Sequence, residues 1–197
     1  MDRPNKNVAR GEATRSQLVA IATRMFAERG YEDTSIEAVL REAGVSRGSL
    51  YHHFASKEAL FEAVAEEVET SVGTQTLAAA AGADGPVAAL RAGSLNWIRL
   101  AGDPVVQRIL LIDAPSVLGW ERWRAMEEDH ALGGIKMTLQ VVVEQGKLRP
   151  ELADTLAHVL LASMNEVALL VARAQDKETA MKDGADAIDE LMQRLFA

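Results

Sequence analysis

The stretch TSIEAVLREAGVSRGSLYHHF, residues 34–54, decides the fold of this chain. It reads as two short helices joined by a turn at Gly44, which are the proportions of a helix-turn-helix. Ser46 is expected to begin the second helix, because a serine oxygen at an N-cap accepts a hydrogen bond from a free backbone N–H group. Leu50 and Phe54 lie four residues apart on one face of this helix, so we expect both side chains to pack inward.

The opposite face of the second helix is polar and rich in hydrogen-bond donors. In a helix-turn-helix the second helix lies in the major groove of DNA, with its N-terminal residues facing the base edges. Arg47 has the geometry to bind guanine O6 and N7, and Ser49 and Tyr51 can donate to phosphates or bases. Lys57, at the start of the next helix, can reach a phosphate near that helix's N-terminus. From spacing alone, a helical corner with a solvated face that binds no DNA is an alternative interpretation.

The rest of the sequence predicts helices and no strands. No segment alternates between apolar and polar residues with a period of two, and the segments between turn signals are too long for strands. We therefore expect an all-α fold of about nine helices. The first expected helices cover about 15–29 after a Thr14 capping box, 35–43 after a Thr34–Glu37 capping box, 47–53, and 57–80 after a Ser56 cap. A helix then opens at Pro86, and another opens at Pro104 and is kinked or ended near Asp113 by Pro115. The last three run from near Gly119 to about Gln145, with either a break or a closely packed backbone at Gly133–Gly134, from Pro150, and over 177–196.

Three regions are expected along the 197 residues. Residues 1–13 are predicted to form a disordered arm, residues 14–60 a helix-turn-helix DNA-binding domain, and residues 61–197 an effector-binding and dimerisation domain. Residues 1–60 hold nine Lys/Arg and eight Asp/Glu, whereas residues 61–197 hold twelve and 21, so the net charge changes from +1 to −9. Because an acidic body repels phosphate, any contact with DNA is expected from the first 60 residues.

Several classes of protein and site are not favoured. The chain has no cysteine, which fits a reducing cytoplasm and excludes disulfides and thiolate metal sites. The polar N-terminus does not predict a signal peptide, and no apolar run is long enough to predict a membrane span. His130 and His158 are isolated, so we expect no metal site. No nucleophile–base motif, phosphate loop or dinucleotide fingerprint is found, so we expect neither catalytic residues nor a cofactor.

Residues 14–61 resemble the TetR (tetracycline-repressor-like) family closely. The similar segments are FAERGY at 26–31, TSI at 34–36, AGVS at 43–46, SLYHHF at 49–54 and KEAL at 57–60. The resemblance implies an all-α homodimer with a C-terminal ligand-binding core. It also implies that eight residues lie at or near double-stranded DNA: Ser35, Arg47, Gly48, Ser49, Tyr51, His52, His53 and Lys57.

The small-molecule effector is expected inside the C-terminal core. A helical stripe of aromatic and polar residues, and an apolar helix that carries polar groups, suggest a cavity with aromatic walls and a few hydrogen-bonding groups. The candidates are Trp97, Arg108, Asp113, Trp120, Trp123, Met126, His130, Asn165 and Glu166. The stripe is equally consistent with ordinary core packing. Asn165 and Glu166 could instead face a dimer partner or solvent, and Asp113 could serve only the bend at Pro115.

The last two helices are expected to form the homodimer interface, as a four-helix bundle. Residues 180–195 carry a stripe of small and apolar residues that includes Ile188 and Leu191. A two-fold dimer implies a palindromic operator. We therefore expect a repressor released by a small, largely apolar effector. The alternatives are an activator or effector-independent regulator of the same fold, a helical ligand-binding module without DNA binding, and, least favoured, an enzyme.

Overall fold

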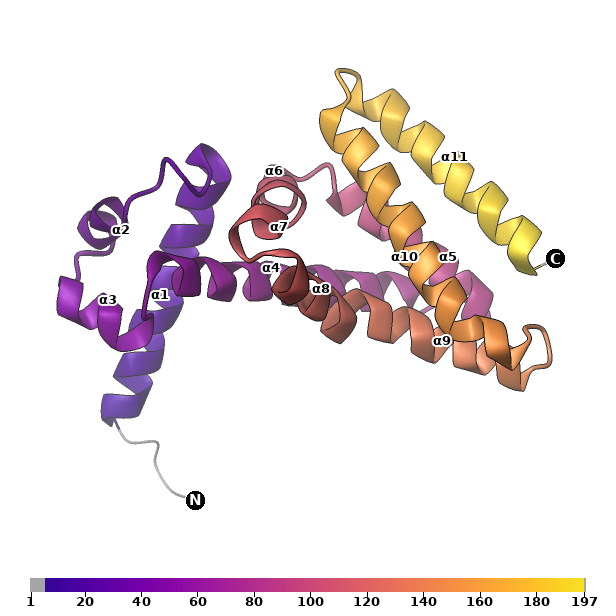
Figure 1. The fold of residues 1–197 in the computed structure, drawn as a ribbon, viewed down its shortest axis with the longest axis horizontal. Coiled ribbons are helices and arrows are strands. Elements are labelled where there is room, and N and C mark those ends of the chain that lie inside the picture. The colour runs from indigo at the N-terminus through magenta and orange to yellow at the C-terminus, as the bar shows by residue number, and fades with distance from the viewer. Residues whose placement is uncertain (1–5, 197) are drawn as a thin grey trace.

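The computed structural model describes residues 6–196, and these residues form nine helical rods and no strand (Figure 1). The all-α prediction is therefore confirmed. The rods are α1 (Lys6–Arg29), α2 (Ile36–Ala43), α3 (Arg47–His53), α4 (Lys57–Ala80), α5 (Pro86–Leu100), a composite rod of α6 (Pro104–Val106), π-helix η1 (Gln107–Asp113) and α7 (Ala114–Val117), a second composite rod of α8 (Trp120–Glu127), π-helix η2 (Glu128–Leu132) and α9 (Gly133–Glu144), then α10 (Pro150–Arg173) and α11 (Lys177–Phe196).

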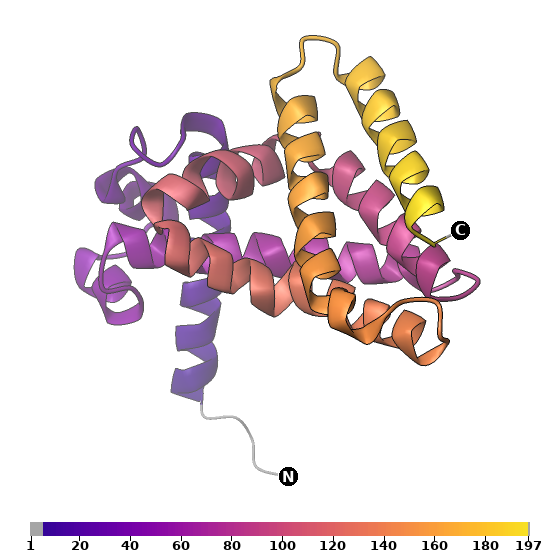
Figure 2. The same ribbon diagram turned by 45° about the vertical axis from the view of Figure 1, so that its right-hand side comes forward.

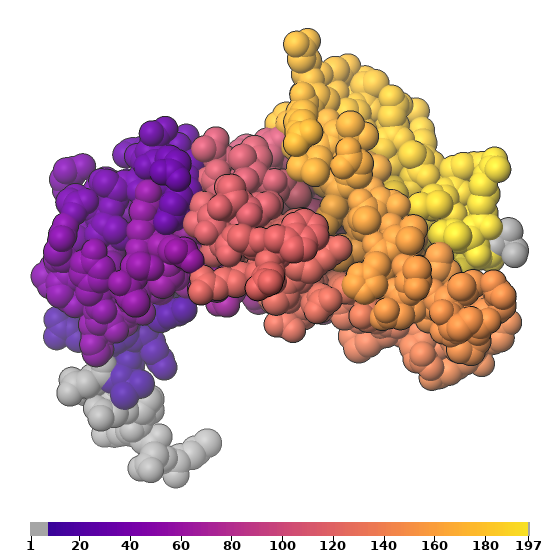
Figure 3. All heavy atoms as spheres, viewed as in Figure 1, coloured from indigo at the N-terminus to yellow at the C-terminus, as the bar shows by residue number. Residues whose placement is uncertain are grey.

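The first three helices and the start of α4 form a head at one end of the molecule, drawn in indigo and purple (Figures 1 and 3). Ser46 and Ser56 cap α3 and α4 as the sequence predicts, each accepting a hydrogen bond from a backbone N–H three residues on. Leu50 and Phe54 are buried, which confirms that this face of α3 holds the helix on the head. The ring of Phe61 from α4 meets the ring of Phe26 edge-on, with 5.2 Å between centroids, so α4 belongs to the same core.

Three predictions about the head are wrong: the disordered arm over residues 6–13, the Thr14 cap and the Thr34 cap. α1 begins at Lys6 rather than Arg15, so residues 6–13 are helical and not a disordered arm; residues 1–5 lie outside the described residues. Thr14 is inside this helix, where its hydroxyl donates to the carbonyl of Arg10 instead of capping. The N-cap of α2 is Ser35 and not Thr34. The Thr34 hydroxyl is buried and turned away from α2, toward the carbonyls of Met25 and Gly30.

α4 runs from the head into a second bundle made of α5, α9, α10 and α11 (Figures 1 and 2). The apolar core of the head continues along the buried side of α4, through Val64, Val68 and Val72, to the composite rod of α6, η1 and α7. A second apolar cluster lies between α5, α9, α10 and α11. Trp97 of α5 packs against both clusters, so the head and the bundle are joined by one packed interior.

Both composite rods contain a π-helical segment near the positions where the sequence predicts an irregular helix. The first rod continues through Pro115 to Val117, so Pro115 does not end the helix near Asp113. The preceding turn is wide, with the N–H of Ala114 donating to the carbonyl of Ile109, and this gives the proline ring room. The second rod continues through Gly133, where an added Cβ would lie 3.2 Å from the carbonyl oxygen of Glu128. The absence of a side chain at Gly133 therefore permits this carbonyl to lie close to the backbone in the π-helical turn.

α10 is the one described helix whose length and apolar composition would allow it to cross a membrane. The core helix of a water-soluble protein passes the same test, so this composition is weak support for a membrane span. Six residues of α10 are buried within the subunit, and the helix packs against α5, α9 and α11. Its apolar character therefore serves the bundle core.

A polar contact ties the head to η1. The carboxylate of Asp113 accepts a hydrogen bond from the backbone N–H of Tyr31 at 2.8 Å and one from Nε of Arg108 at 3.2 Å. Asp113 is only 7% exposed, so both bonds lie largely out of water. The guanidinium of Arg108 lies over Gly30, the last residue before Tyr31. Gly30 has a φ of +83°, and an added Cβ would lie 1.8 Å from Nη2 of Arg108.

Gly30→Ala is therefore expected to destabilise the protein by about 1–3 kcal/mol, from the left-handed backbone and the displaced arginine together. Urea unfolding would measure the change in the free energy of unfolding. Gly73→Ala is the matched control: Gly73 is inside α4, and nothing lies within 4 Å of an added Cβ. The control should gain about 0.5–1 kcal/mol from higher helix propensity. Equal effects of the two changes would contradict the role assigned to Gly30.

Candidate DNA-binding surface and effector cavity

The outer face of α3 carries the residues that the family resemblance assigns to DNA. Arg47, Gly48, Tyr51 and His52 are exposed, and Ser49 is half-exposed. Arg47 forms an ion pair with Glu37 of α2, and its guanidinium carbon lies 6.0 Å from the centroid of the Tyr51 ring. Both charged side chains are about 60% exposed, and such pairs contribute little to stability, so Arg47 is free to exchange Glu37 for another partner.

The remaining three predicted residues lie around this face. Ser35 is exposed, and its side-chain oxygen accepts from the N–H of Ala38 as the N-cap of α2. The ring of His53 lies 5.1 Å from the ring of His52. Nζ of Lys57 is 4.1 Å from the centroid of the Tyr31 ring and donates to the carbonyl of Glu32 at 3.4 Å. Lys57 is thus held at the N-terminus of α4, where an anion is favoured.

One cation near this surface is absent from the sequence predictions. Arg15 of α1 is exposed, and its guanidinium carbon lies 5.3 Å from the centroid of the Phe54 ring at the end of α3. No local motif signals this placement, because it depends on how α1 crosses α3.

A cavity of about 470 Å³ lies in the bundle, between α4, α5, the rod of η2 and α9, and α10. This volume is within the usual range of small-molecule sites. Three predicted effector residues line it: Trp97, His130 and Asn165. Most of the remaining wall is apolar, with side chains such as Val72, Leu77, Leu90, Ile135, Met137, Leu161 and Met164.

Three carboxyl residues in the cavity wall, Glu69, Glu127 and Asp129, were not predicted from the sequence, and the first two are buried. Glu127 is paired with Arg124 at 2.8 Å and accepts a hydrogen bond from the side-chain amide of Asn165. Glu69 is 7% exposed, and no described residue is hydrogen-bonded or ion-paired to its carboxylate within residues 6–196. Burial, reinforced by the charge of Glu127, raises the pKa of Glu69 from its ordinary value of 4.5 to about 7. Burial also raises the pKa of Glu127, against the opposing effect of Arg124 and Asn165.

The sequence does carry a signal for Glu69. It lies four residues after Ala65 and three before Val72, and both of these are buried. A carboxyl group at this spacing falls on the buried side of the helix, where it requires a partner or a cavity.

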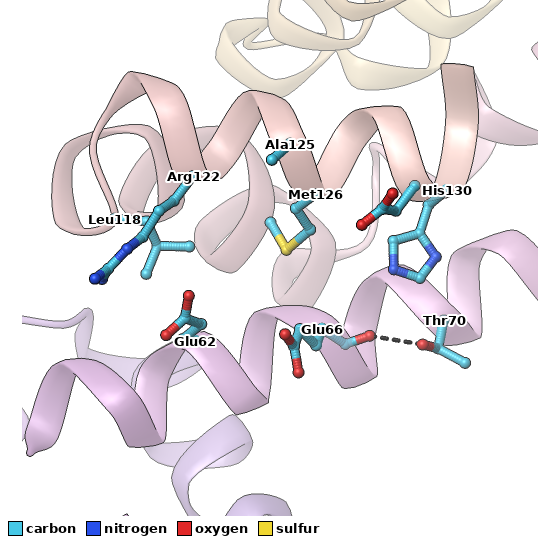
Figure 4. Close-up of a pocket in the computed structure, with 9 residues that line it drawn as sticks. Glu62, Glu66, Thr70, Leu118, Arg122, Ala125, Met126 and His130 are labelled. Carbon is cyan, nitrogen blue, oxygen red and sulfur yellow. Dashed lines mark hydrogen bonds between the residues drawn. The ribbon is translucent and has the colours of Figure 1, made fainter. Parts of the chain in front are cut away.

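A second, smaller cavity of about 320 Å³ lies between α4 and α8 (Figure 4). It has a polar wall that includes Glu62, Glu66, Arg122 and His130, and the predicted effector residue Met126 contributes its thioether. In Figure 4 the hydroxyl of Thr70 donates to the carbonyl of Glu66 within α4. Thr70, Asp129 and His130 line both cavities, so the two adjoin along this edge.

Five predicted effector residues line neither cavity. Trp120 is 63% exposed, and Trp123 packs against the head-side core, so their regular spacing marks a helix face that meets solvent and core. Arg108 and Asp113 are engaged in the contact with Gly30 and Tyr31 described above. Glu166 is exposed on α10, and Asn165 lines the larger cavity. Asn165 therefore faces the cavity, whereas the adjacent Glu166 lies on the outer surface of the subunit.

The fold combines a helix-turn-helix head with a helical bundle that contains a cavity. Comparison with known proteins identifies the family to which this combination belongs. Residues 18–64 match the family described as bacterial regulatory proteins, tetR family, and residues 87–195 match the tetracyclin repressor-like C-terminal domain. The chain belongs to the TetR family. Members of this family are regulators, which agrees with the prediction that the chain is not an enzyme.

Individual relatives resemble this chain over different lengths. It is 38% identical over 79 residues to the HTH-type transcriptional repressor Rv1474c of Mycobacterium tuberculosis, a match covering 40% of each chain. It is 42% identical over 64 residues to the A-factor receptor protein of Streptomyces griseus, covering 32% of this chain and 23% of that protein. The chain therefore spans less than half the length of these curated relatives.

Solved structures match nearly the whole chain. A TetR-family transcriptional regulator from Pectobacterium atrosepticum is 29% identical with a TM-score of 0.82, covering 96% of this chain and 97% of that one. RolR, solved in complex with the ligand resorcinol, is 19% identical with a TM-score of 0.72, covering 96% of each chain. At that identity the likeness to RolR shows the fold alone.

The raised pKa of Glu69 predicts a pH-dependent stability. Because the folded protein binds this proton more tightly than the unfolded chain does, the free energy of unfolding should fall as pH rises from about 4.5 to about 7. Glu69→Gln removes this contribution. The variant should therefore gain up to about 3 kcal/mol relative to the unmodified protein between pH 4.5 and pH 8.

Urea unfolding of both proteins at several pH values would measure this difference. Glu67→Gln, an exposed neighbour on α4 that lines neither cavity, is the control and should keep the pH dependence of the unmodified protein. Parallel pH profiles for the unmodified protein and Glu69→Gln would show that Glu69 titrates normally in the fold.

Proposed function

We propose that this chain is a DNA-binding transcriptional regulator, most simply a repressor that binds a palindromic operator as a homodimer in the cytoplasm and is released by a small, largely apolar effector. The observation that carries DNA binding is the donor-rich outer face of α3, held outward by the burial of Leu50 and Phe54. A repressor is favoured over an activator because one relative, Rv1474c, is named a transcriptional repressor. The cavity in the bundle supports the proposal of a small-molecule effector.

The charge distribution supports contact through the head alone. Residues 61–197 carry a net charge of −9, so the bundle repels phosphate, while Arg47 and Lys57 lie on the head. Both cations have weak partners in the free protein, an exposed carboxylate for Arg47 and an aromatic face for Lys57. DNA can replace these partners at small cost.

Replacing Arg47 and replacing Lys57 are expected to weaken DNA binding in different ways. Arg47→Ala should cost about 1–3 kcal/mol on the preferred operator and relax selectivity at about one base pair per half-site, because it loses a base contact. Lys57→Ala should weaken binding to all duplexes alike and reduce the salt dependence, because a phosphate contact carries no sequence information.

Fluorescence anisotropy with an operator selected from a randomised duplex pool, and with a scrambled duplex, would measure both effects over a range of salt concentrations. Lys147→Ala is the control, because Lys147 is an exposed lysine in the turn between α9 and α10, away from the head and from the proposed dimer interface. An equal loss of affinity for both duplexes in Arg47→Ala would show that Arg47 contacts the DNA backbone and not the bases. No salt-dependent binding to any duplex would overturn the proposed function.

The homodimer is proposed to form through the exposed faces of α10 and α11. On α10 the large apolar side chains of Val159 and Leu170 are 46% and 59% exposed, and Glu166 lies on the same outward face between them. Exposed apolar side chains on one helix face favour a protein partner. Ile188, expected from the sequence to face that partner, is 2% exposed within the subunit's own core and is therefore unsuitable for testing the interface.

The double substitution Val159→Asp and Leu170→Asp should convert the dimer to monomers, because it places four charges in a two-fold interface. Light scattering would measure the mass, and circular dichroism would check that the helices remain. Val141→Asp, on the exposed side of α9 outside both cavities, is the control and should stay dimeric. A mass of one chain for the unmodified protein would refute the proposed interface.

A further inference from the structure

We propose that the effector of the larger cavity is an organic cation, an apolar molecule bearing one protonated amine or quaternary nitrogen that sits beside Glu69. This inference deepens the proposed function and rests on the larger cavity being the effector site. Three observations carry it: the sign of the charges in the wall, the unpartnered state of Glu69, and the apolar and aromatic character of the remaining surface.

The charged side chains in the cavity wall are almost all acidic. Among residues 6–196, Glu69, Glu127 and Asp129 line the cavity, no lysine or arginine does, and His130 is the only lining group able to become positive. Arg124 pairs with Glu127 but does not line the cavity. A wall of this sign disfavours carboxylate or phosphate ligands and attracts cations.

Glu69 is the carboxylate best placed to meet a ligand. It is more than nine-tenths buried, it lines the cavity, and none of the described residues neutralises it or donates a hydrogen bond to it. An unpaired buried carboxylate is costly, and a cation in the cavity would remove that cost. Glu127 differs because Arg124 and Asn165 already satisfy it. Glu127 therefore contributes long-range attraction, whereas Glu69 provides the direct contact.

The rest of the cavity suits the apolar body of such a ligand. Its wall is formed largely by aliphatic side chains from α4, α5, α9 and α10, with the ring of Trp97 among them. An aromatic ring attracts an organic cation, and aliphatic surface binds the attached hydrocarbon. A neutral apolar effector would fit the aliphatic wall equally well but would leave Glu69 without a partner, so it is the competing outcome of the test.

Calorimetry with the full chain would test the proposal with a matched pair of probes. Benzyltrimethylammonium is the cation, and neopentylbenzene, with carbon in place of nitrogen, is its neutral counterpart of the same shape. Hexyltrimethylammonium and tetraphenylphosphonium extend the range of cation sizes. Each probe would be titrated into the unmodified protein, Glu69→Gln, and the control Glu67→Gln, whose exposed side chain lies outside both cavities.

We expect the best cation to bind at least about tenfold more tightly than the neutral probe. Glu69→Gln should remove that preference while leaving the affinity of the neutral probe within about twofold, which also shows that the cavity remains folded. Glu67→Gln should change neither. The proposal is overturned if the neutral probe binds as tightly as the cations, if Glu69→Gln keeps the cation affinity, or if no cation binds more tightly than about 1 mM.

A second readout is the release of a proton when the cation binds. Because the pKa of Glu69 is about 7, a bound cation should displace a fraction of a proton at neutral pH, which titrations in buffers of different ionisation enthalpy detect. Glu127, held by Arg124, and Asp129 and His130 at the cavity wall are the other titratable groups near it. Proton release that persists in Glu69→Gln would come from these groups and would count against Glu69.

The same probes separate this inference from the proposed function. Operator binding would be measured with and without each probe. A cation that binds through Glu69 without weakening operator binding would uphold the site and refute release by the effector. Release by neutral molecules alone would uphold the proposed function and refute the cationic effector.

Discussion

The burial of one side of α4 holds the molecule together, because the same helix supplies apolar side chains to the head and to the bundle. Leu60 and Phe61 pack inside the head, while Val68 and Val72 continue the same core toward the bundle. Each fully buried side chain of this size contributes about 1.5–3 kcal/mol, so neither half can release α4 without losing much of its stability. The DNA-facing end and the cavity-facing end of α4 are therefore parts of one rigid element.

A second connection between the head and the rest of the molecule does not pass through α4, and it is polar rather than apolar. The Asp113 carboxylate accepts a hydrogen bond from the backbone of Tyr31, and Arg108 covers Gly30. η1 therefore contacts the residues that directly follow α1. η1 also packs against α4. With two connections, a displacement of α4 by a ligand beside Glu69 is expected to turn the head about the Asp113 contact. Two heads in a dimer must lie about 34–36 Å apart to enter successive major grooves, so a small turn changes the fit.

The features that local chemistry fixes were predictable from the sequence. The serine caps at Ser46 and Ser56 and the inward face of α3 depend on neighbouring residues, and all of these predictions are confirmed. Features that depend on tertiary contacts were not predictable. Thr34 and Ser35 are both good capping residues, and the choice between them depends on the carbonyls of Gly30 and Met25, which accept the Thr34 hydroxyl in the folded head.

The same limit applies to the candidate sites. The eight residues proposed to face DNA follow from the family resemblance, and most of them lie on one exposed surface in the structure. The spacing of Trp120 and Trp123 identifies a helix face but not what that face meets, which is solvent and the head-side core. Glu69 was detectable as a carboxyl group at a buried helical position, whereas its proximity to Glu127 requires the fold.

We propose that the cavity and the head are coupled energetically through α4. Calorimetry would compare the binding of the tightest cation probe to the free dimer and to the dimer saturated with its selected operator. Because coupling is reciprocal, we expect the operator to weaken probe binding about 5–150-fold, by the same factor by which the probe weakens operator binding. Identical probe affinities in the two states would show that the cavity and the head are not coupled.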